Sequence, residues 1–199
     1  RMLSCLPVIG LEIGLLWWGI GALCRLLALP ELLSAAVLCA APYLLTGFMH
    51  LDGFMDVTDA VRSYRSLERR REILKDSHVG SFAVIGVALV ILFQYSACAG
   101  LTSAGELRAL ALIPAVSRCC SVLAIQLLPP MQTSQYANRQ VHWVLPVLML
   151  AAAIGFGFWL SAVTGLALLA VAAGFCLALL RAYRSLRGMN GDISGYCLT

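Results

Sequence analysis

The feature that most constrains this sequence is a series of long apolar stretches, each long enough to cross a lipid bilayer as a helix. A spanning helix needs about 20 mostly apolar residues. Lipid offers no partners to backbone N–H and C=O groups, so such spans form helices. The sequence therefore predicts an all-α, polytopic transmembrane helix bundle, a single integral membrane domain over residues 1–199. Its six spans are expected at about 6–28, 32–49, 79–100, 106–128, 143–160 and 162–181.

The composition excludes a water-soluble domain. The chain is 61% hydrophobic and 12% charged, whereas about a quarter of the residues of an ordinary soluble domain are charged. In water, such a chain would expose large apolar patches. Soluble enzymes and nucleic-acid-binding modules are therefore excluded, and membrane lipid is an expected partner. The sequence leaves homo-oligomerisation open.

The positive charges predict the orientation of the bundle. Six of the fourteen Lys and Arg residues lie between Arg62 and Lys75, and loops rich in these residues stay in the cytoplasm. With six spans, both chain ends lie on that same side. We therefore expect the segment 50–78 and the C-terminal polar segment 182–199 to share the cytoplasmic face.

Three aspartates follow the second predicted span. Asp52, Asp56 and Asp59 are spaced by four and three residues, which on a helix places them within a sector of about 60°. Like charges on one stripe repel each other, and Mg²⁺, a cation that prefers oxygen ligands, would relieve that repulsion. The structural alternative is an interfacial helix whose acids pair with downstream arginines. Charges that abut a membrane span are usually functional, which favours the metal site.

A basic stretch with a short turn follows the aspartates. Arg71 and Lys75 are donors suited to phosphate oxygens, although such residues also anchor a protein to anionic lipid. We expect Lys75 to face the site. Asp76 would add a carboxylate, Ser77 lies beside it, and Gly80 would let the backbone approach a ligand.

The late aspartate, Asp192, lies among glycines 188, 191 and 195. This pattern predicts a loop with close backbone contacts. The six-span topology places Asp192 on the same face as Asp52, so two distant segments are expected to form one composite site.

One arginine, Arg118, lies near the middle of the fourth predicted span. An arginine in lipid costs several kcal/mol unless it is paired or hydrated. Glu12 and a phosphate-bearing substrate are the two candidate partners.

The stretch 46–86 resembles the signature of the cobalamin synthase family. That family carries a His-x-Asp-Gly-x-x-Asp-x-x-Asp stretch, a Lys-Asp-Ser-x-x-Gly turn, a Ser-Arg pair and a late Gly-Asp element followed by Gly. The matching residues here are His50, Asp52, Gly53, Asp56, Asp59, Lys75, Asp76, Ser77, Gly80, Ser117, Arg118, Gly191, Asp192 and Gly195.

The resemblance implies a transferase of cobalamin biosynthesis in the cytoplasmic membrane of a bacterium or archaeon. Its small-molecule substrates would be a corrinoid nucleotide, adenosylcobinamide-GDP, and α-ribazole or its 5′-phosphate. A ribose hydroxyl would attack the pyrophosphate, and GMP would leave. The implied cofactor is Mg²⁺, on Asp52, Asp56, Asp59 and Asp192. The implied catalytic residues are Asp59, Lys75 and Asp76. Phosphate binding is implied for Arg71, Lys75, Ser77, Gly80 and Arg118.

Two other classes of protein remain open from the sequence. A CDP-alcohol phosphotransferase also uses spaced aspartates with Mg²⁺, but the Asp-x-x-Asp-Gly-x-x-Ala-Arg order of that family is missing. A divalent-cation transporter predicts acids within the spans, where only Glu12 qualifies.

Overall fold

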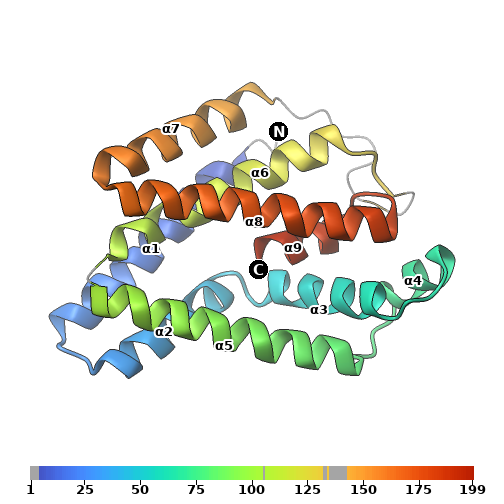
Figure 1. Ribbon diagram of the computed structural model, residues 1–199, viewed down its shortest axis with the longest axis horizontal. Coiled ribbons are helices and arrows are strands. Elements are labelled where there is room, and N and C mark those ends of the chain that lie inside the picture. Colours follow the sequence, from blue (N-terminus) through green and yellow to red (C-terminus); the bar gives the residue numbers. More distant parts are fainter. Residues whose placement is uncertain (1–4, 105, 132–133, 135–142) are drawn as a thin grey trace.

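The structure is a computed structural model that describes residues 5–104, 106–131, 134 and 143–199 (Figure 1). Every regular element in those ranges is a helix, as the sequence predicts. In chain order the helices are α1 (Leu6–Leu26), α2 (Glu31–Leu45), α3 (Met49–Arg62), α4 (Leu67–Ile73), α5 (Ser81–Ala104), the short 3₁₀ helix η2 (Leu107–Ala111), α6 (Ile113–Leu127), α7 (Val144–Leu160), α8 (Ala162–Leu186) and α9 (Gly191–Leu198).

Four helical segments are long and apolar enough to cross a bilayer, namely α1, α5, α8 and the η2–α6 segment. The pair α2 and α3 passes the same test only when taken together. Helix α7 is apolar but only 17 residues long. The chain is therefore a multi-pass helical membrane protein, with four or five candidate spans in its described residues. The count of six spans stays a prediction.

The second predicted span ends earlier than expected because the chain bends sharply. The axes of α2 and α3 differ by 88°. Gly47 and Phe48, between them, have φ values of 59° and 62°, a left-handed conformation that ends a helix. The bend separates the apolar α2 from the polar α3, which carries the three aspartates.

Helix α6 is the central helix of the bundle. Its spanning segment is 72% buried inside the molecule, against 11% for α5. Small side chains such as Ala115, Cys119 and Ser121 let neighbouring helices approach α6 closely. At the junction with α1, a Cβ added to Gly14 would lie 2.1 Å from the carbonyl oxygen of Ala111, so α1 has no room there for a side chain.

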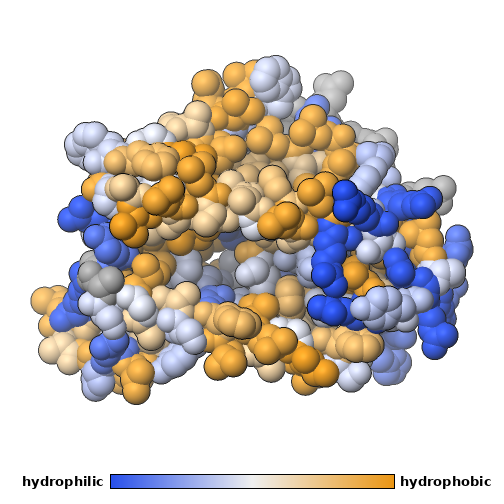
Figure 2. Space-filling view, in the orientation of Figure 1, coloured by the Kyte–Doolittle hydropathy of each residue, from blue (hydrophilic) through white to orange (hydrophobic). Residues whose placement is uncertain are grey.

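The helices form two layers in Figure 1, with α6, α7 and α8 in one and α2, α3 and α5 in the other. Helix α9 lies between the layers, where it packs on α3, α6 and α8. Figure 2 shows apolar side chains along α7, α8 and α5. Hydrophilic side chains gather most densely at the end of the molecule that holds α4 and the last turn of α8.

Candidate active site

The aspartate stripe lies on α3, as the sequence predicts. Asp52 is exposed, and Asp56 and Asp59 are half-buried. The pKa of Asp56 is raised from 3.8 to about 6, first by burial and then by the negative charges of Asp52, Asp192 and Asp59. The structure therefore brings Asp192 near the α3 aspartates, although over a hundred residues separate it from them in sequence.

Asp192 belongs to a helix, so the prediction of a loop around it was wrong. Asn190 caps the N-terminus of α9, because its Oδ1 accepts a hydrogen bond from the N–H of Ile193 (3.0 Å). The Asn190 Nδ2 donates to Asp192 Oδ2 (2.7 Å) and so orients the carboxylate. Burial raises the pKa of Asp192, and the charge of Asp52 raises it further.

Two glycines bring α9 against α3. A Cβ added to Gly53 would lie 2.8 Å from the carbonyl oxygen of Asp192, and a Cβ added to Gly195 would lie 3.2 Å from that of His50. The expected close backbone contacts around Asp192 are thus present, and they are made with α3. Any side chain at Gly53 would push Asp192 away from the other carboxylates.

Asp59 joins α3 to the start of α5. Its Oδ2 accepts from the N–H of Gly80 (2.6 Å), and its Oδ1 accepts from the N–H of Ala83 (2.8 Å). These are groups at a helix N-terminus, where a carboxylate is stabilised. A Cβ added to Gly80 would lie 2.7 Å from both carboxylate oxygens. The group that approaches Gly80 is therefore the side chain of Asp59, so the close approach there needs no external ligand.

The carboxylate cluster fits a magnesium ion in the chemistry of its donors. Mg²⁺ takes oxygen ligands, usually from one or two carboxylates, and completes its shell with water and substrate phosphate. The pKa of Asp56 is raised first by burial and then by the negative charges of the neighbouring carboxylates, charges that a bound cation would offset. Among the described residues, however, no three His, Cys, Asp or Glu side chains stand close enough to hold a metal by themselves.

Arginine side chains of the basic helix α4 form hydrogen bonds with the C-terminal end of α8. Arg71 donates from Nε to the carbonyl oxygen of Leu186 (3.1 Å) and from Nη2 to that of Arg187 (3.0 Å). Arg70 donates from Nη1 to the carbonyl oxygen of Ser185 (3.3 Å). Cations at a helix C-terminus stabilise its last carbonyl groups. The structure therefore gives Arg71 a partner within the chain, which the sequence did not suggest.

The turn after α4 is exposed at Lys75, Asp76 and Ser77. Asp76 accepts hydrogen bonds from the N–H and the Nδ1 of His78 (3.0 and 2.6 Å), which lower the pKa of Asp76. Within the described ranges, no hydrogen bond or ion pair joins the three side chains to the carboxylates of α3 or α9. The contact with the Asp59 carboxylate is made a few residues further on, by the backbone N–H groups of Gly80 and Ala83.

Arg118 is buried in α6, but Glu12, one of its two candidate partners, is exposed and forms no ion pair with it in the described structure. The pairing with Glu12 was therefore a wrong alternative. Instead, Arg118 donates from Nη2 to His50 Nε2 (3.2 Å) and from Nη1 to the carbonyl oxygen of Pro114 (3.3 Å). Burial, and then the charge of Arg118, lower the pKa of His50 to about 4, so its imidazole is neutral and accepts the bond. Arg118 and His50 line a cavity of about 220 Å³.

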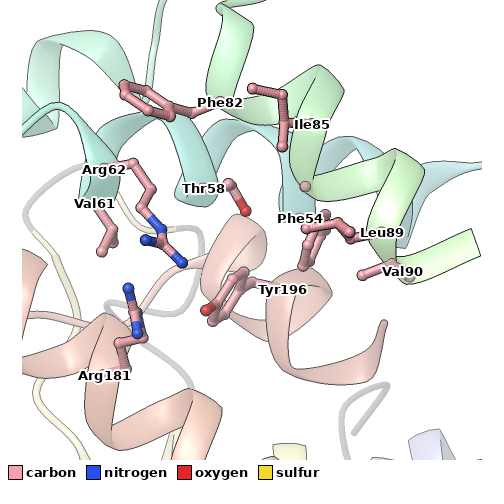
Figure 3. A pocket seen from close by; sticks show the side chains of 11 residues that line it. Phe54, Thr58, Val61, Arg62, Phe82, Ile85, Leu89, Val90, Arg181 and Tyr196 are labelled. Atoms are coloured by element: carbon pink, nitrogen blue, oxygen red, sulfur yellow. The ribbon is translucent and has the colours of Figure 1, made fainter. Parts of the chain in front are cut away.

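A second cavity, of about 490 Å³, lies on another face of α3 and was not predicted from the sequence (Figure 3). Phe54 of α3 stacks on Tyr196 of α9, with ring centroids 5.4 Å apart. Arg62 and Arg181 point into the same space. The sequence signal for this cavity is the spacing of residues 54, 58 and 62, which is that of one helix face.

The comparisons with known proteins agree on one family. The model of the CobS family, described as cobalamin-5-phosphate synthase, matches residues 1–199. An adenosylcobinamide-GDP ribazoletransferase of Clostridium perfringens (strain SM101 / Type A) is 35% identical over 207 residues, which cover 100% of this chain and 82% of that protein. Proteins of the same name from Syntrophobacter fumaroxidans and Lachnoclostridium phytofermentans are 35% and 32% identical, over 96% of this chain in each case and 79% and 76% of theirs. No solved structure matches the chain. The resemblance in residues 46–86 thus extends over the whole sequence, and the chain belongs to the CobS family of cobalamin-5-phosphate synthases.

Proposed function

We propose that the carboxylates of α3 and α9 form the site at which this chain acts as an adenosylcobinamide-GDP ribazoletransferase. The activity follows from the family and from relatives that align with almost the whole chain. Membership of this family decides against the two other classes of protein, the CDP-alcohol phosphotransferase and the divalent-cation transporter. The observation that carries the location of the site is the approach of Asp192 to Gly53, because it adds a distant carboxylate to the aspartate stripe.

In this reaction a ribose hydroxyl of α-ribazole, or of its 5′-phosphate, attacks the phosphorus that carries the cobinamide group. The new P–O bond forms a phosphodiester, and the bond to the GMP phosphate breaks. GMP leaves with the electron pair of the broken bond, and the hydroxyl proton passes to a base. The product is adenosylcobalamin or its phosphate, in the last steps of cobalamin synthesis.

One or two carboxylates of the set Asp52, Asp56 and Asp192 would hold Mg²⁺ in this proposal, with water and substrate phosphate as its other ligands. The ion, when bound, neutralises the pyrophosphate oxygens as charge moves to the leaving group. Asp59 remains part of the predicted metal set, but both of its oxygens already accept backbone hydrogen bonds. We therefore give it the further role of holding the start of α5 against α3, close to the other carboxylates.

Phosphate binding is proposed for the turn at residues 75–77 and for Arg118. Lys75 and Ser77 are exposed and lie just before Gly80, which contacts Asp59, so they can reach a ligand at the carboxylates. Arg118 has no carboxylate partner in the described structure and lines a cavity with His50. His50 thereby connects the start of α3 to α6 and helps to position the stripe. We propose that the whole site faces the cytoplasm.

Turnover by the purified chain in detergent tests this proposal. Adenosylcobinamide-GDP, α-ribazole 5′-phosphate or α-ribazole, and Mg²⁺ are supplied, and the products are identified by mass spectrometry. We expect Asp56→Asn to lower the rate by about a thousandfold, since loss of a metal ligand at a phosphoryl-transfer site costs several kcal/mol. Glu68→Gln, which removes an exposed carboxylate from α4, is the matched control. Wild-type activity of Asp56→Asn at limiting Mg²⁺ would show that the stripe is only structural.

A further inference from the structure

The second cavity on α3 is separate from the carboxylate stripe. Its α3 wall consists of Phe54, Thr58, Val61 and Arg62. Of these, residues 54, 58 and 62 follow each other at intervals of four. At about 100° per residue, this face is turned well away from that of Asp52 and Asp56. The cavity of about 490 Å³ is completed by α5, α8 and α9 (Figure 3).

The cavity contains donors but no acidic side chain. Arg62 enters from α3 and Arg181 from α8 (Figure 3), and neither forms a hydrogen bond or an ion pair with any described residue. The Oγ1 of Thr58 is buried without a hydrogen-bond partner. Guanidinium groups have no acceptor function and match phosphate oxygens in geometry. An anionic phosphate group would therefore satisfy all three side chains.

The opposite wall of the cavity is apolar and continues onto the outside of the molecule. Phe82, Ile85 and Leu89 of α5 are between 45% and 56% exposed. Helix α5 packs mainly on α2 and α3, so this side of it is left to face the membrane. A small phosphate compound would satisfy the arginines but would leave this wall uncovered. An amphiphile with a phosphate headgroup and a long apolar chain would cover both.

We infer that the cavity binds one anionic phospholipid, with its phosphate between Arg62 and Arg181 and an acyl chain along α5. The cavity lies toward the end of the bundle that carries the arginine-rich α4, where the negative lipids of the cytoplasmic leaflet concentrate near basic residues. Burial of the acyl chain against α5 adds apolar contact to the charge attraction. The inference does not depend on the reaction proposed for the carboxylates.

Native mass spectrometry of the full chain, purified in mild detergent, tests the inference with dioctanoyl phosphatidylglycerol and dioctanoyl phosphatidylcholine as probes. We expect tighter binding of phosphatidylglycerol by the wild-type chain. The double variant Arg62→Gln/Arg181→Gln should bind it about tenfold more weakly, since charged hydrogen bonds are lost. The variant Arg65→Gln/Arg184→Gln removes the same net charge from exposed residues outside the cavity and should bind like the wild type.

Several outcomes would overturn the inference. One is equal binding of the two lipids by the wild-type chain, a measurement that needs no variant to fold. Another is an equal loss in both double variants, which would mean that only net charge matters. A third is unchanged phosphatidylglycerol binding by the cavity variant with weaker binding of α-ribazole 5′-phosphate, which would make the cavity a substrate-phosphate site.

Discussion

At the scale of single residues, the candidate site depends on places where a side chain is absent. Gly53 lets the backbone of α9 lie against α3, and Gly80 leaves room for the carboxylate of Asp59. The aspartates alone would not form the site, because their grouping requires these contacts. The sequence pointed to both glycines through the family motif, but it assigned the space at Gly80 to a ligand. Which group fills a space depends on the packing of two helices, and a motif does not encode that.

A first prediction concerns Gly53→Ala. The added Cβ would lie 2.8 Å from the carbonyl oxygen of Asp192, so α9 must shift, at a cost of about 1–3 kcal/mol of folding stability. We expect a loss of turnover of at least about tenfold, equivalent to about 1.4 kcal/mol of barrier. Gly19→Ala, where the new Cβ meets no atom within 4 Å, should leave melting temperature and turnover unchanged. Equal behaviour of the two variants would contradict the role of the contact.

A second prediction concerns the pH dependence that Asp56 confers. Its pKa is about 6 in the folded chain and near 3.8 when unfolded. A raised folded pKa means that its stabilising contribution is complete below about pH 4 and is lost as the pH rises through 6. Relative to Asp56→Asn, the wild-type melting temperature without Mg²⁺ should therefore fall between pH 4 and 7. Addition of Mg²⁺ at pH 7 should raise the melting temperature of the wild type but not that of Asp56→Asn.

Asp76→Asn is the control for that experiment, because hydrogen bonds from His78 lower the pKa of Asp76. Its contribution has the opposite sign and is lost as the pH falls through the lowered pKa. A pH profile of Asp56→Asn that coincides with the wild-type profile would exclude a shifted carboxyl group at position 56.

At the scale of elements, side chains of one helix form hydrogen bonds with backbone groups at the end of another helix. Asp59 of α3 accepts from the start of α5, and Arg70 and Arg71 of α4 donate to the end of α8. The sequence predicted the helices and the aspartate face, since both follow from local spacing. It did not predict these end contacts, or that His50 rather than Glu12 meets Arg118, because such partners depend on how each helix is rotated in the bundle. The sequence predicted a loop in place of α9, because the nearby glycines indicate a loop more strongly than Asn190 indicates the start of a helix.

A third prediction follows for Arg71→Ala. The change removes two hydrogen bonds to the last carbonyl groups of α8, and we expect a loss of about 1–3 kcal/mol in stability. Arg69→Ala breaks only an exposed ion pair with Glu72, and such pairs contribute at most about 1 kcal/mol. Thermal unfolding in detergent measures both. A rise in KM for the phosphorylated substrates, with an unchanged melting temperature, would instead make Arg71 a phosphate ligand.

At the scale of the whole molecule, the polar segments predicted from the sequence come together. Arg71 contacts the end of α8, and α9 packs on α3. This agrees with the same-side placement derived from the six-span topology, although the described residues give only four or five candidate spans. The apolar surfaces of α5, α7 and α8 in Figure 2 are those expected to meet lipid.

A fourth prediction concerns the orientation in the membrane. In intact cells, a membrane-impermeant maleimide should not label Arg65→Cys, because the arginine-rich segment is expected in the cytoplasm. It should label Ser103→Cys, which is exposed near the far end of α5. Both changes are made in a chain whose exposed Cys5 and Cys176 are replaced by serine. The reverse labelling pattern would place the candidate active site outside the cell.

The order of the helices along the chain has a consequence for synthesis. Helix α9 follows α1 to α8 in the chain, yet it supplies Asp192 and must fit between α3, α6 and α8. A nascent chain that has inserted only its first spans into the bilayer contains the aspartates of α3 but not yet Asp192. The proposed catalytic centre is therefore completed only after α8 and α9 have left the translocation machinery. Partly inserted chains should be inert, so that no substrate is turned over before the bundle has closed.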